Sequence, residues 1–166
     1  MRLLRAAACR SLTGCLLALS FAVSAAAQPP PTVLDLAMQQ KNLTAFVGAV
    51  HSAGLDDMLR GPGPLTVYAP TDDAFAKMPA AERTALFANP ERLRAMVLGV
   101  LVKDSVVMRD GDRTVTSGYV PSAGGGNLTF AVDDGQTQTV NGARLVRADM
   151  RAANGIVDEI DSVPDK

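Results

Sequence analysis

The spacing of apolar residues changes halfway along this chain. In the first half it is helical, and the clearest stretch places Leu43, Phe46, Val47 and Val50 at positions i, i+3, i+4 and i+7. From Ser105 onward, short β-prone segments alternate with glycine-containing turn sequences. Helices followed by strands favour an α+β domain, with the helices packed on a mainly antiparallel sheet, over an alternating β-α-β fold.

Helix-capping residues mark boundaries in the first half. Thr32 and Asp35 have the spacing of a capping box, and Thr71 and Asn89 are suited to cap two later helices. Gly54 can end a helix in the left-handed conformation. The sequence therefore predicts helices that begin after Thr32, Thr71 and Asn89, and one that ends at Gly54.

The remaining elements are predicted from local composition. Residues 65–69 favour a strand that ends at Pro70, and a helix is expected from Pro79 through about Ala88. The helix that begins at Pro90 is predicted to carry one apolar side: Leu93, Met96, Val97, Val100 and Leu101. In the second half, strands are expected around residues 106, 114–115, 128–130, 137–140, 145–146 and 156–157.

The first 27 residues have the composition of a secretory signal. Arg2, Arg5 and Arg10 have no acid to balance them, and an apolar run over residues 16–23 follows. Small residues before Gln28 predict cleavage after Ala27. We therefore expect a signal peptide at 1–27, a proline-rich lead-in at 28–31 and one domain at 32–164.

The apolar run also bears on membrane attachment. It is shorter than the ~20 residues that cross a bilayer, so no transmembrane span is expected in the mature chain. Residues 12–15 fit a lipobox, which would make Cys15 a lipidated anchor. Because most of the run follows Cys15, a freely secreted or periplasmic protein is favoured over a lipoprotein. Cys9 lies in the removed segment too, so no disulfide is expected.

The charge balance argues against nucleic acid as a partner. Without its first 27 residues the chain has 13 basic and 17 acidic side chains, a net charge of −4. Asn42 and Asn127 begin N-glycosylation sequons, which would carry glycans only in a eukaryotic secretory route. The Ala- and Arg-rich composition is instead typical of a bacterial chain.

Two segments resemble the fasciclin (FAS1) family. Residues 65–75 resemble its first conserved block, and residues 140–143 with 154–163 resemble its closing block. The likeness spans roughly residues 32–164 and implies a fasciclin-like fold of the single-domain, secreted bacterial type. The motif positions are Thr66, Tyr68, Ala69, Pro70, Thr71, Asp72, Phe75, Asn141, Gly142, Asn154, Gly155, Ile156, Ile160 and Asp161.

These motif residues are expected to act mainly in folding. Pro70 and Thr71 end a strand and start a helix, and Phe75 has the offset to fill the core. The Asn154-Gly155 pair supplies a tight turn, and Ile156 and Ile160, with Val163, supply buried strand faces.

The resemblance implies an interaction or adhesion module. Receptor-binding members of the family often carry a Tyr-His pair after the helix that begins near Pro90, and Gly99 and Val100 stand there in this chain. That departure argues against receptor binding of the animal kind. The expected function is non-enzymatic binding of a protein, polysaccharide or matrix partner, without a cofactor. The alternative is a periplasmic carrier of a small molecule or lipid, because the aliphatic composition could line an apolar cavity.

The polar clusters of the sequence suggest no catalytic or metal site. His51 lies beside an apolar stripe without a nucleophile, so a surface histidine is favoured over the base of a hydrolase. Asp72-Asp73 is interpreted as a helix start. Asp158, Glu159 and Asp161 alternate along a strand, which leaves too few ligands on either side for calcium, and we expect them to be solvated.

Three other features are interpreted as structural. Asp133-Asp134-Gly135 is expected to form a hairpin turn, and Gly124-Gly125-Gly126 a flexible connection. The scattered methionines are expected to fill the core: Met38, Met58, Met78, Met96, Met108 and Met150.

Overall fold

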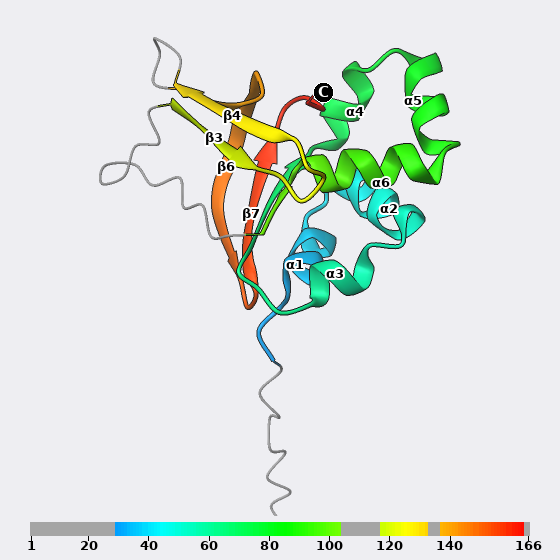
Figure 1. Cartoon of the computed structure of the whole chain (residues 1–166). Helices are drawn as coiled ribbons and strands as arrows, with labels where there is room; N and C mark the ends of the chain where they lie inside the picture. The colour runs from blue at the N-terminus through cyan, green and yellow to red at the C-terminus, as the bar shows by residue number, and fades with distance from the viewer. Residues whose placement is uncertain (1–28, 104–116, 133–136, 165–166) are drawn as a thin grey trace, which may run out of the picture.

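A computed structural model of the chain describes residues 29–103, 117–132 and 137–164 (Figure 1). The predicted signal peptide with its cysteines, the strands expected near residues 106 and 114–115 and the Asp133-Asp134 turn lie outside these residues. The helices are α1 (Val33–Gln39), α2 (Thr44–Ala53), α3 (Asp56–Arg60), α4 (Asp72–Lys77), α5 (Ala80–Phe87) and α6 (Pro90–Gly99). The strands are β1 (Leu65–Pro70), β2 (Leu101–Val102), β3 (Ser117–Pro121), β4 (Asn127–Val132), β5 (Gln138–Val140), β6 (Ala143–Ala152) and β7 (Gly155–Ile160).

The strands form one seven-stranded sheet in the order β2-β1-β7-β6-β5-β4-β3. Only β1 and β7 pair in parallel, and the other neighbours are antiparallel. In Figure 1 the helices gather on one side of the sheet, and β3 and β4 lie over the opposite side. The predicted α+β architecture, helices on a mainly antiparallel β-wedge, is therefore confirmed.

Most of the predicted helix ends are confirmed by their hydrogen bonds. The Thr32 side chain accepts from Asp35 N–H, and Asp35 accepts from the Thr32 backbone, so the capping box is complete. Gly54 ends α2 with φ +64°, the left-handed conformation that favours glycine. Asn89 caps α6 and Pro90 occupies its first turn.

Two predicted element boundaries were wrong. The helix that begins at Pro90 ends at Gly99, so two residues expected on its apolar side lie outside it. Val100 is the C-cap, and Leu101 already belongs to β2. The short strand expected at residues 145–146 is only part of the ten-residue β6, which contains register irregularities between Leu145 and Met150.

The core lies between the sheet and the helices. Leu34 from α1, Phe46 and Val50 from α2, and Val97 from α6 are fully buried in one cluster with Val67 from β1. Met58, Met78, Met96 and Met150 are partly buried and pack against this core, as expected for most of the methionines, whereas Met38 is 51% exposed and is not core filler. None of the described helices has the length and apolar character needed to cross a membrane.

Two acidic residues of β7 are buried, contrary to expectation. Asp158 is 0% and Glu159 is 3% exposed, whereas Asp161 is partly exposed. Strand β7 is covered on both faces, since helices lie on one side and the β3–β4 part of the sheet lies on the other (Figure 1). Side chains on alternate faces of such a strand are all buried, so neither face is exposed to solvent. The prediction of solvated acids failed for this reason.

Candidate functional site

The two motif segments meet where β1 pairs with β7, a contact that we call the β1–β7 seam. In the register of this parallel pair, Thr66 is opposite Ile156, and Pro70 is opposite Ile160. Tyr68, Ala69, Ile156 and Ile160 are all buried there. The structure therefore brings together motif residues that lie far apart in the sequence.

The Asn154 side chain connects the β1–β7 seam to helices α1 and α3 by hydrogen bonds. Its side-chain amide donates to Leu59 O at 2.9 Å and to Gly61 O at 2.7 Å, and its Oδ1 accepts from Val33 N–H at 2.8 Å. One side chain thus satisfies the ends of α3 and α1 while its own backbone carbonyl accepts from Leu65 N–H.

Gly155 is required by close packing rather than by its backbone angles. A Cβ atom at this position would lie 2.0 Å from the Leu65 carbonyl oxygen. A Cβ atom added to Gly63 would lie similarly close to Asn154 O. The β6–β7 turn consists of Ala153 and Asn154 rather than the expected Asn154-Gly155 pair, because Gly155 already pairs with Ala152 as the first residue of β7. Gly155 is there because it lets two backbones approach closely.

Asp72 serves two helices. Thr71 caps α4 by accepting from Ala74 N–H, and Asp72 lies in the first turn of that helix. The Asp72 carboxylate also accepts from Thr44 Oγ1 at 2.6 Å and from Ala45 N–H at 2.7 Å, at the start of α2. Helix α2 has no cap from its own N-cap residue Leu43, so a residue distant in the sequence caps it.

The other motif residues also make structural contacts. Phe75 is 2% exposed and its ring packs on Phe87 at 5.7 Å. Asn141 and Gly142 have φ angles of +49° and +78°, as a tight β5–β6 turn requires. Partial burial would raise the pKa of Asp161, but the Arg144 N–H and the Lys77 ammonium group outweigh burial and lower it.

His51 lies away from these residues. Its side chain is 46% exposed near the end of α2, and its Nδ1 atom contacts the Asp56 carboxylate. These contacts fit the surface interpretation made from the sequence.

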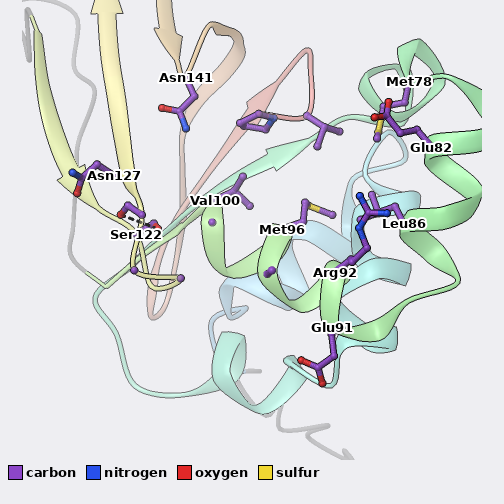
Figure 2. A pocket seen from close by; sticks show the side chains of 17 residues that line it. Met78, Glu82, Leu86, Glu91, Arg92, Met96, Val100, Ser122, Asn127 and Asn141 are labelled. Carbon is purple, nitrogen blue, oxygen red and sulfur yellow. Dashed lines mark hydrogen bonds between the residues drawn. The ribbon is translucent and has the colours of Figure 1, made fainter. Parts of the chain in front are cut away.

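An open groove lies beside α6, and we call it the α6 groove (Figure 2). It encloses about 770 Å³, a size within the range of small-ligand sites. One wall consists of α5 and α6, and the other of the turn at residues 122–127. Its apolar lining comprises Met78, Leu86, Ala95, Met96, Val100, Val163 and Pro164.

Polar groups also line the α6 groove. They include Glu82 and Arg92 on the helical wall, and Ser122, Asn127 and Asn141 on the strand side. Figure 2 shows Arg92 directed toward Leu86, between α5 and α6. An apolar floor with a few polar neighbours can bind an apolar group and orient it.

The glycine turn of the groove is held in place. Gly124 N–H donates to Leu98 O at 3.0 Å, and Ala123 N–H donates to Leu101 O at 2.7 Å. Ser122 bonds to Gly126 O through both its N–H and its hydroxyl group, and Gly125 has φ +82°. The expected flexible connection is therefore a tight turn docked on the end of α6.

Sequence reasoning missed most of this groove. The sequence singles out Gly99, Val100 and Asn141 for other reasons, but no pattern in it connects Met78, Met96 and Arg92. They come from α6 and the segments around it, and no spacing in the sequence relates them. The periodicity of α6 could only have indicated that Met96 and Val100 share a face.

Comparison with known proteins identifies the fold and the family of this chain. A pair of FAS1 domains from the insect cell adhesion molecule Fasciclin I superposes with a TM-score of 0.57 at 20% identity, over 74% of this chain and 44% of that structure. The chain therefore has the FAS1 fold. Its sequence matches the Fasciclin domain family over residues 41–163, and the chain belongs to this family.

Relatives of the chain include bacterial and animal proteins. Protein sll1483 of Synechocystis sp. is 36% identical over 141 residues, which cover 84% of this chain and 76% of that protein. The pig transforming growth factor-beta-induced protein ig-h3 is 33% identical over 135 residues, which cover 81% of this chain but only 19% of that protein. Human periostin is 25% identical over 125 residues, 75% of this chain and 15% of periostin.

Proposed function

We propose that this chain is a non-enzymatic interaction module that binds a partner through the α6 groove. The observation that carries the proposal is the position of Gly99 and Val100. Both line the groove, and they stand where receptor-binding members of the family often carry a Tyr-His pair. The resemblance therefore implies recognition at this position, and the different side chains here imply a partner other than an animal receptor.

Gly99 also keeps the groove open. A Cβ atom added there would meet no atom of the neighbouring described elements within 4 Å, whereas one added to Gly124 would lie 3.2 Å from the backbone of Leu98 and Gly99. The space beside the end of α6 is therefore available to a side chain of the partner.

The lining favours a protein partner over a polysaccharide. Met78, Leu86 and Met96 present flexible aliphatic and thioether groups, which adapt to apolar side chains. The residues that line the groove include no aromatic ring on which a sugar could stack. The structural relative from insects is a cell adhesion molecule, and this supports adhesion as the class of function.

The test is a variant that fills the groove. Gly99→Tyr places a ring in the open space without a clash at Cβ, and Gly48→Tyr is the matched control, since Gly48 on α2 is also unobstructed at Cβ and does not line the groove. Purified wild-type protein should bind envelope or matrix fractions of its host, Gly48→Tyr should bind equally, and Gly99→Tyr should lose binding. Equal binding by all three proteins would refute the groove as the binding surface.

A carrier of a small apolar molecule is the second candidate. It is favoured by the volume of about 770 Å³ and by the apolar floor. Native mass spectrometry of protein isolated from its host separates the candidates, because a carrier retains a ligand of defined mass that Gly99→Tyr excludes. An interaction module shows only the mass of the polypeptide.

We further propose that the chain is exported. The arginines and apolar run of residues 1–27 support cleavage after Ala27, with secretion or a periplasmic location, and lipidation at Cys15 is the alternative. The intact mass of the host protein distinguishes a chain that starts at Gln28 from one that starts at a lipid-modified Cys15.

A further inference from the structure

Two methionine side chains form part of the floor of the α6 groove. Met78 is the C-cap residue of α4, Met96 lies on α6, and both line the groove. Each is partly buried against the core, and Figure 2 shows both at the groove, with Met96 extending into it from α6. Their thioether groups are therefore supported by the core on one side and open to molecules that enter the groove on the other.

The sulfur atoms of the groove differ from two others in their polar contacts. The sulfur atoms of Met38 and Met150 each lie near an arginine guanidinium nitrogen, at 4.0 Å and 3.8 Å. Among the residues that the structure describes, no donor contacts the sulfur of Met78 or Met96. A thioether reacts with an oxidant through a lone pair on sulfur, and in the groove these lone pairs remain available.

The composition of the exported chain leaves thioethers as the main targets of an oxidant. The two cysteines of the sequence, Cys9 and Cys15, lie within the segment that we propose is removed, and the sequence contains no tryptophan. Export also takes the chain to compartments that oxidise sulfur groups more readily than the cytoplasm does. Methionine is then the side chain most open to oxidation.

We propose that Met78 and Met96 form a reversible oxidation site that controls apolar binding in the α6 groove; the control of binding rests on the function proposed above. In the forward step a sulfur lone pair attacks one oxygen of hydrogen peroxide, an S–O bond forms, the O–O bond breaks and water leaves. The sulfur is oxidised to the sulfoxide and the peroxide is reduced. In the reverse step a methionine sulfoxide reductase oxidises two thiols to a disulfide and returns the thioether and water.

The sulfoxide changes the groove more than it changes the fold. Its oxygen is a polar acceptor that needs a hydrogen-bond donor, and in an open groove water provides one. An apolar group that docks on the floor displaces this water and leaves the oxygen without a donor, which is an unfavourable arrangement. We therefore expect oxidation to weaken binding about 10-fold or more while the protein stays folded.

Peptide mass spectrometry locates the site without any binding partner. Protein isolated from its host is treated with increasing hydrogen peroxide, and the gain of one oxygen atom is followed at each methionine. Met78 and Met96 should be oxidised several-fold faster than Met58, which packs against the core and does not line the groove. The midpoint of thermal unfolding should change little at the peroxide dose that modifies Met78 and Met96, because water can hydrate the new oxygens.

Matched variants connect the site to binding. Met78→Leu/Met96→Leu keeps the apolar volume of the floor and has no sulfur to oxidise there, and Met38→Leu/Met150→Leu, which removes two sulfurs outside the groove, is the control. After peroxide treatment and removal of the peroxide, wild type and the control should bind host envelope or matrix fractions about 10-fold or more weakly. The Met78→Leu/Met96→Leu variant should keep its binding, and a sulfoxide reductase with dithiothreitol should restore that of wild type.

Each failure has its own signature. Oxidation of Met78 and Met96 no faster than that of Met58 would exclude the site itself, whether or not the protein binds a host fraction. Equal binding by oxidised and untreated wild type would exclude control of the groove and leave the function proposed above standing. Absence of binding by the untreated protein would overturn both that function and the control of binding, while the peroxide series still decides the oxidation site.

Discussion

The β1–β7 seam and the α6 groove differ in how closely their atoms approach. At the seam, a single added carbon on Gly155 would lie 2.0 Å from Leu65 O, whereas at Gly99 in the groove it would meet no neighbouring element of the described chain within 4 Å. Motif residues at the seam are enclosed by contacts from several elements, so a change there must disturb the fold. The groove can change its side chains without such a cost, as a recognition surface requires.

The largest expected effect comes from breaking the seam. Gly155→Ala forces the Leu65 and Gly155 backbones apart and should cost about 4 kcal/mol or more of unfolding free energy, measured by urea denaturation. Gly48→Ala is the control, because it adds the same methyl group to an unobstructed position in α2 and should stabilise the protein by up to ~1 kcal/mol. Comparable stability of the two variants would show that the seam is not tightly packed.

Buried Asp158 of β7 predicts a pH dependence of stability. The pKa of Asp158 is raised from 3.8 to about 7 in the folded chain, so the folded state binds more protons than the unfolded state between these values. The unfolding free energy should therefore fall as the pH rises through this window, by up to ~4 kcal/mol, and level off above it. Thermal unfolding of wild type and Asp158→Asn at pH 5 and pH 8 measures this, and an equal change in both proteins would contradict it.

A smaller loss is expected at the Asn154 side chain. Asn154→Ala removes three hydrogen bonds that join the seam to α1 and α3, and should cost ~2–3 kcal/mol. Asn127→Ala is a suitable comparison, since this exposed asparagine of the groove should change stability by less than ~0.5 kcal/mol. If chemical denaturation found the two variants alike, Asn154 would have no anchoring role.

The smallest effect concerns the shared cap of α2. Asp72→Ala removes the acceptor for Thr44 and Ala45 and should cost ~1 kcal/mol. Asp73→Ala changes the same helix start of α4 without touching α2, so the difference between the two variants in calorimetry isolates the cap. No difference would mean that α2 does not depend on Asp72.

Much of the fold could be predicted from the sequence because its signals are local. The capping box at Thr32, the left-handed Gly54 and the Asn89-Pro90 helix start each depend on neighbouring residues, and the structure shows them as expected. The motif resemblance identified the family that the comparisons show.

The failures share a physical cause, which is that burial is set by distant segments. Asp158 and Glu159 are acidic residues of a strand and were expected to be solvated, yet both are buried because β7 is covered on both faces. Met78 and Met96 pack against the core as expected, but they also line the groove beside the turn at residues 122–127, which their spacing did not indicate. The local spacing of residues carries no information about such long-range placement.

Hydrogen exchange of the protein with and without its bound partner tests the central claim most directly. The account predicts that binding slows exchange at the backbone amides of α6 and of the turn at residues 122–127, while the β1–β7 seam, already protected, changes little. Protection confined to α1 and α3, with α6 and this turn unaffected, would contradict the assignment of the α6 groove as the binding surface.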